Sequence, residues 1–111
     1  MKAYEAMELT NGSIREKKIF FQIRLSWLCG VLNSKIKSNA ELGQVSASLD
    51  NVNKRTAKLY FPLMAKYYER DGYFVCYIDH YDYYNFFAVI WDKNKVPNKL
   101  YNYDYHTEKG E

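Results

Sequence analysis

The stretch that decides the fold runs from Asn39 to Asp92 and reads NAELGQVSASLDNVNKRTAKLYFPLMAKYYERDGYFVCYIDHYDYYNFFAVIWD. Near its end lie two apolar runs, Tyr73–Asp79 and Phe86–Asp92. Both are rich in Phe, Val, Ile, Tyr and Trp, the residue types that pleated and half-buried strands prefer. They predict an antiparallel hairpin, and Gly72 just before it is a typical stop for a preceding helix.

The helix that ends before Gly72 is predicted from apolar residues three or four positions apart. Its expected inward positions are Val52, Thr56, Leu59, Leu63 and Tyr67. Asp50 is the expected N-cap. Pro62 requires a kink or a restart of the helix, because proline has no backbone N–H and disfavours helix at the residue before it. Three basic residues fall on the opposite side of this helix: Lys54, Arg55 and Lys58.

The first part of the chain gives a mixed pattern. Thr10-Asn11-Gly12-Ser13 is a turn signal, because Asn-Gly accepts the positive φ angles of a tight turn, and it predicts a hairpin within residues 1–18 that Tyr4–Leu9 enters as a strand. Ile19–Leu32 alternates apolar and polar residues like a strand, yet it also carries a polar stripe at helical spacing. A strand passing into a helix and one continuous helix both fit it. Ala40–Ser48 is predicted as a short helix capped by Asn39.

Length and composition indicate one domain. A chain of 111 residues has room for one core and can bury about two-thirds of its unfolded surface. We expect a single α+β domain over residues 1–111, with helices packed on a small antiparallel sheet. Tyr101, Tyr103 and Tyr105 predict an edge strand in a partly frayed tail over residues 100–111. Because the sequence shows neither a secretion signal nor a membrane span of ~20 apolar residues, we expect a cytoplasmic protein with no membrane partner.

Charge and aromatic content favour a role in surface binding. Residues 12–68 contain ten Lys or Arg and three acids, whereas residues 69–111 contain five bases and eight acids. Eight of the twelve tyrosines lie between Tyr60 and Tyr84. Tyrosine has a polar tip that suits the boundary of a core and the surface of a rigid binding site. The plainer interpretation is a solvated surface of uneven charge above a core rich in aromatic rings.

The pattern of a catalytic site is absent from the sequence. It contains no Gly-rich phosphate loop, no nucleophile elbow and no Glu- and His-rich helix. His80 and His106 are the only histidines, and a loop histidine beside acids is common by chance. Cys29 and Cys76 lie in apolar runs without zinc or disulfide spacing, which predicts reduced core thiols. We therefore expect no catalytic residues, no metal, no cofactor and no small-molecule substrate.

The order of residues in the quoted stretch resembles winged helix-turn-helix DNA-binding domains. The residues that carry the resemblance are Glu41-Leu42, Leu49, Val52, Arg55-Thr56, Leu63 and Arg70-Asp71-Gly72-Tyr73-Phe74. In that family a short helix and a turn precede the recognition helix, and a glycine leads into the wing. The resemblance implies DNA or RNA binding by Lys54, Arg55 and Lys58 on the recognition helix. The basic balance of the chain adds three expected phosphate contacts, Arg15, Lys17 and Lys18.

The tip of the predicted hairpin favours a different partner. Asp79–Asn85 is acidic and would repel the phosphate backbone that a wing touches. Such a tip suits docking onto the basic groove of a host nucleic-acid-processing protein, in the style of small phage or mobile-element inhibitors of restriction or CRISPR enzymes. A homodimer through an apolar face of the hairpin is the simplest form of this alternative. The expected contacts are Tyr77, Tyr81, Asp82, Tyr83 and Tyr84.

Overall fold

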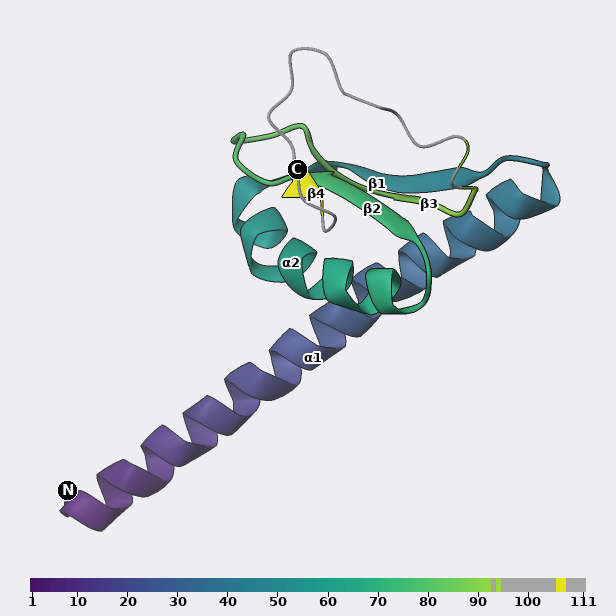
Figure 1. The fold of residues 1–111 in the computed structure, drawn as a ribbon. Helices are drawn as coiled ribbons and strands as arrows, with labels where there is room; N and C mark the ends of the chain where they lie inside the picture. Colours follow the sequence, from purple (N-terminus) through teal and green to yellow (C-terminus); the bar gives the residue numbers. More distant parts are fainter. Residues whose placement is uncertain (93, 95–105, 108–111) are drawn as a thin grey trace. The chain divides into compact units, whose positions relative to one another are not determined.

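The computed structural model describes residues 1–92, 94 and 106–107. Figure 1 shows the elements in chain order, which are helix α1 (Ala3–Glu41), strand β1 (Ser46–Val52), helix α2 (Lys54–Arg70), and strands β2 (Phe74–Ile78), β3 (Asn85–Ile90) and β4 (His106–Thr107). The strands form one antiparallel sheet in the order β1-β3-β2-β4. The predicted α+β class is confirmed. The chain divides into two units, residues 1–30 and residues 31–111, which we describe separately.

In the first unit, residues 3–30 are all helical and belong to α1. The predicted hairpin within residues 1–18 is therefore wrong, and Ile19–Leu32 is helix throughout. A helix closes its hydrogen bonds within the segment, whereas a hairpin needs a paired strand, and Gly12 costs a helix only about 1 kcal/mol. Within the described residues, no helix has both the length and the apolar character that a membrane span requires.

The predicted short helix over Ala40–Ser48 is also wrong. α1 continues to Glu41 and stops at Gly43, which has a φ of 82°, the left-handed conformation that ends many helices. β1 then begins at Ser46. Asn39 lies inside α1, and its side-chain Nδ2 donates a hydrogen bond of 2.9 Å to the Ser46 carbonyl instead of capping a helix. This bond joins the end of α1 to the start of the strand.

The N-cap of α2 is Asn53, whose Oδ1 accepts a hydrogen bond of 2.9 Å from the Thr56 amide. The predicted cap, Asp50, lies in β1. Pro62 lies inside α2 without ending it, because its neighbours Phe61 and Met64 are fully buried and their packing offsets the lost backbone hydrogen bond.

The side of α2 that faces the core differs from the predicted one by one residue. The buried positions are Ala57, Tyr60, Phe61, Met64, Ala65 and Tyr68. Leu59 and Tyr67, which were predicted to point inward, are exposed. The aromatic rings explain the shift, since each buries more apolar area than a leucine does.

The helix stop and the hairpin are confirmed. Gly72 has a φ of 98° just after α2, and the Tyr73 amide donates to the Tyr68 carbonyl at 3.0 Å. β2 and β3 pair antiparallel, with Tyr77 opposite Phe87. The edge strand predicted at Tyr101–Tyr105 lies outside the described residues.

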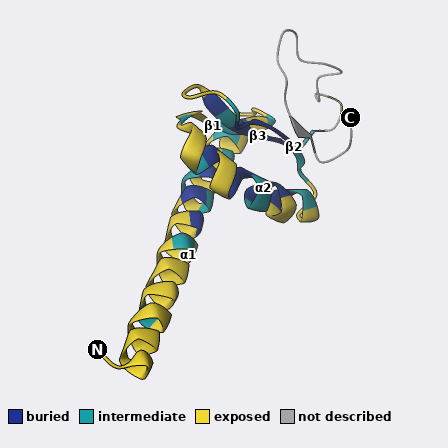
Figure 2. Cartoon of the chain, turned by 90° about the vertical axis from the view of Figure 1, so that its left-hand side faces the viewer, coloured by how far each residue is buried: buried dark blue, intermediate teal, exposed yellow. Residues whose placement is uncertain are grey.

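Aromatic rings join α2 to the sheet. Figure 1 shows α2 along one face of the strands. The Phe61 ring lies 5.9 Å from the Tyr77 ring and 5.3 Å from the Phe87 ring, measured between centroids. The hydroxyl of Tyr68 donates a hydrogen bond of 2.7 Å to Oδ1 of Asn33, which ties residues 31–41 of α1 to α2. Figure 2 shows the buried residues concentrated in the sheet, on α2 and at this end of α1.

Truncating a buried residue of α2 tests which side of the helix faces the core. Met64→Ala is expected to lower the free energy of unfolding by about 2–5 kcal/mol, because Met64 is fully buried and its loss leaves a cavity. Leu59→Ala, at a position that is 50% exposed, should cost less than about 1 kcal/mol. Denaturant unfolding followed by circular dichroism measures both values. Equal losses would contradict the orientation of α2.

Candidate nucleic-acid interface

The exposed side of α2 is basic. Lys54, Arg55 and Lys58 are all exposed, as the sequence predicts. Lys66 and Arg70 are exposed as well, and they were missed in the sequence although they stand 11 and 15 residues after Arg55, close to whole turns of a helix. α2 contains a single acid, Glu69. Positive charge therefore extends along the whole helix.

The tip of the hairpin presents tyrosine rings to solvent. Tyr83 is 66% exposed and Tyr84 is 77% exposed, while Tyr81 and Asp82 are also exposed. Tyr77 is different, because it is buried in β2 and stacks on Phe87 with 5.8 Å between ring centroids. It supports the hairpin and presents no binding surface of its own.

The side-chain amide of Asn85 fixes the shape of the tip. Asn85 is fully buried, and its Oδ1 accepts a hydrogen bond of 3.0 Å from the Tyr81 amide. Its Nδ2 donates to the carbonyls of Tyr81 at 2.7 Å and of Val52 at 2.9 Å. Tyr84, next to it, has a φ of 69°, an uncommon value for a residue with a side chain. The loop is thus held in one tight conformation by buried and satisfied polar groups.

A backbone hydrogen bond brings the tip to the start of α2. The Lys54 amide donates to the Asp82 carbonyl at 3.2 Å. Two residues before Lys54, the Val52 carbonyl accepts the hydrogen bond from Asn85. Figure 1 shows the loop between β2 and β3 beside the first turn of α2. The basic helix and the tyrosine tip, which the sequence suggested as two rival sites, therefore form one surface. We call it the basic–tyrosine surface: Lys54, Arg55, Lys58, Tyr81, Asp82, Tyr83 and Tyr84.

The tip is less acidic at its surface than its sequence indicates. Of its two acids, Asp79 is 8% exposed and makes contacts within the fold, so only Asp82 is open to solvent. The His80 ring packs on the Tyr81 ring with 4.3 Å between centroids. In the described residues, no group of three or more His, Cys, Asp and Glu side chains is placed to hold a metal ion.

Two further groups of predicted or reactive residues belong to other elements of the chain. Arg15, Lys17 and Lys18 are exposed on α1, in the unit of residues 1–30 and not in the unit that carries α2. Cys76 is buried, and burial raises the pKa of its thiol to about 12. The thiol stays protonated at neutral pH, which confirms the expectation of an inert core cysteine.

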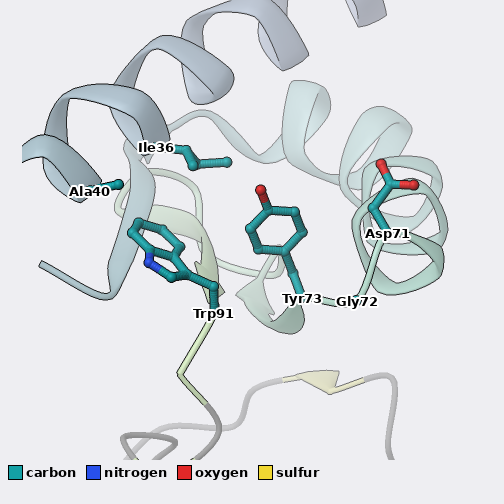
Figure 3. A pocket seen from close by; sticks show the side chains of 6 residues that line it. All are labelled: Ile36, Ala40, Asp71, Gly72, Tyr73 and Trp91. Carbon is teal, nitrogen blue, oxygen red and sulfur yellow. The ribbon is translucent and has the colours of Figure 1, made fainter.

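A separate pocket of about 350 Å³ lies at the other end of α2. Its lining residues are Ile36, Ala40, Asp71, Gly72, Tyr73 and Trp91. Figure 3 shows the Tyr73 ring between Trp91 and Asp71, and the two aromatic rings meet edge to face at 6.2 Å. The described residues of the pocket offer apolar walls and one carboxylate, and none of them is a cation that would attract a phosphate.

Removing the amide of Asn85 tests what holds the tip. Asn85→Ala leaves the Val52 and Tyr81 carbonyls without this donor, so amide exchange should accelerate at Tyr81 and at Lys54. Asn39→Ala, which also removes a side-chain donor to a backbone carbonyl, is the matched control and should leave both amides protected. Hydrogen exchange measured by NMR reports both. Unchanged protection in Asn85→Ala would contradict the assignment.

The comparison with known proteins leaves the interpretation of this surface to its geometry. No protein-family model, no curated protein and no solved structure matches the chain.

Proposed function

We propose that this chain binds nucleic acid through the basic–tyrosine surface, and that it prefers single strands to duplexes. The observation that carries the proposal is the hydrogen bond from the Lys54 amide to the Asp82 carbonyl. Through it the loop that carries the exposed Tyr83 and Tyr84 meets the first residue of the helix that carries three exposed cations. Cations that follow a phosphate backbone and aromatic rings that stack on bases are the two parts of a typical single-strand site.

The cations supply affinity that does not depend on sequence. Lys54, Arg55 and Lys58 lie within about one and a half turns of α2, and Asp82 is the single exposed acid of the adjoining tip. The local balance is therefore positive. Each phosphate that a cation neutralises releases condensed counterions, which favours binding at low salt.

The tyrosines supply the preference for single strands. Stacking of a base on an exposed aromatic ring contributes about 1–3 kcal/mol, and only unpaired bases can turn outward to use it. The element before α2 also favours single strands over duplexes. It is strand β1, whereas duplex recognition by a helix-turn-helix uses a helix in that place.

A second function fits the same tip. Exposed tyrosines beside an exposed aspartate on a rigid loop also suit docking onto the basic groove of another protein, as in a phage-type inhibitor of a nucleic-acid-processing enzyme. The rigidity that Asn85 gives the loop favours it, because little conformational entropy is lost on docking. In this case Lys54, Arg55 and Lys58 would be solvent-exposed charges with no role in binding.

The salt dependence of binding tests the role of the cations. We expect fluorescence anisotropy with labelled oligonucleotides to show tighter binding of single strands than of duplexes at ~50 mM salt. Lys58→Ala should weaken binding and reduce the slope of log affinity against log salt by about 0.7 for single strands. Lys37→Ala, a loss of the same charge from an exposed position on α1, should leave the slope within error of the parent. No binding to either form at ~50 mM salt would overturn the proposal.

The tip variant separates the two functions. Tyr83→Ala with Tyr84→Ala should weaken binding of single strands at least tenfold, and it should leave the weaker duplex binding unchanged. Tyr4→Ala, at another exposed tyrosine, is the control. If the tip variant binds single strands as well as the parent does, stacking is excluded. If it instead loses a protein captured by the parent, the docking function is supported.

A further inference from the structure

The α1 segment in residues 1–30 leaves an apolar side open to solvent. Ile19, Phe20, Ile23 and Trp27 are 55–72% exposed, and their spacing of one, three and four residues places them on one side of the helix. Leu25 and Leu28 are buried and lie on the other side. The helix is thus apolar on two opposite sides, which is typical of a helix that is covered on both. Figure 2 shows how much of its surface is exposed.

We propose that a second copy of this chain covers the open side, with the two α1 segments packed antiparallel about a two-fold axis near Glu16. This inference is independent of nucleic-acid binding, since it uses none of the residues of the basic–tyrosine surface. It places self-association on α1 and not on the hairpin, whose apolar residues are largely buried in the described part of the chain.

The exposed area matches what a dimer needs. At 150–250 Å² for each aromatic side chain and somewhat less for isoleucine, the four residues leave about 500 Å² of apolar surface open on each chain. Leu9, which is 63% exposed, extends the same side. Two copies would bury more than about 1,000 Å², the area at which specific interfaces begin.

The charges decide the direction of pairing. Residues 1–16 contain three acids, Glu5, Glu8 and Glu16, while residues 17–30 contain three bases and no acid. A parallel pair would align the bases of both chains. An antiparallel pair centred on Glu16 brings Glu8 level with the partner's Arg24, so fewer like charges face each other than in a parallel pair, although the two Glu16 side chains then face each other.

The same register gives Phe20 a place to pack. Centring the pair on Glu16 sets Phe20 opposite the partner's Gly12 and Ile23 opposite the partner's Leu9. A Cβ atom built on Gly12 would meet nothing within 4 Å, so the backbone there is open for a large ring to approach. Pairing a bulky residue with glycine is what close helix packing requires.

Light scattering coupled to size exclusion tests the proposal. At ~100 μM we expect the parent to run at twice the chain mass of 13.2 kDa. Phe20→Ser with Ile23→Ser should give a monomer. Met7→Ser with Ile14→Ser removes the same number of exposed apolar residues from the opposite side of α1 and should leave the dimer intact. A monomeric parent, an assembly larger than a dimer, or equal behaviour of the two double variants would overturn the proposal.

The substitution Gly12→Leu tests the register and keeps the result interpretable. Leucine favours helix over glycine and meets no atom in the monomer, so circular dichroism should show unchanged or greater helix content. In the pair it collides with the partner's Phe20, so the dimer should dissociate at least tenfold more readily. A Gly12→Leu protein that is as helical and as dimeric as the parent would rule out the antiparallel register.

Discussion

The basic–tyrosine surface depends on one buried side chain, the amide of Asn85. Its three hydrogen bonds join the amide and the carbonyl of Tyr81, across the turn, and the carbonyl of Val52 at the end of β1. These bonds fold Tyr81–Tyr84 back against the strand that leads into α2, where the Asp82 carbonyl meets the Lys54 amide. Without them the tip would be an ordinary loop whose tyrosines have no fixed neighbour. The contact between the tip and the first turn of α2 is therefore a property of the fold.

The rigidity of this arrangement comes from the aromatic contacts beneath it. Phe61 of α2 packs on Tyr77 and Phe87 of the hairpin, so the helix and the two strands share one aromatic core. A helix anchored in this way keeps its exposed side at a constant angle to the tip. The exposed apolar residues of α1 between Ile19 and Trp27 belong to the other unit, residues 1–30, and are not part of this arrangement.

The elements that could be predicted from the sequence were those with strong local chemistry. Gly72 ended a helix and the Phe-, Val- and Ile-rich runs paired as strands, because each signal acts within a few residues. Asn11-Gly12 gave a wrong prediction of a hairpin. A turn signal forms a hairpin only when paired strands flank it, and here both residues lie inside the long helix α1. β1 was missed because its buried residues, Ala47 and Leu49, are only two in number.

The composite site could not have been predicted from the sequence, because it depends on contacts between distant residues. Asn85 and Val52 are 33 residues apart, and neither is part of a recognisable motif. Three of the exposed bases of α2, Lys54, Arg55 and Lys58, were found from composition and spacing, but the tyrosines of the adjoining tip were assigned to a rival function. The acidity of the tip was the reason for assigning the tip and the basic helix to different functions. Burial of Asp79 weakens that reason, because it leaves only one of the two acids of the tip exposed.

The central claim is that the bases of α2 and the tyrosines of the tip act on one ligand together. The most direct measurement is an NMR titration of the protein with a single-stranded oligonucleotide, following amide shifts along the chain. The account predicts that the amides of Lys54, Arg55, Lys58, Tyr83 and Tyr84 shift together with one dissociation constant. Shifts confined to one of the two groups, or separate dissociation constants for the helix and the tip, would contradict it.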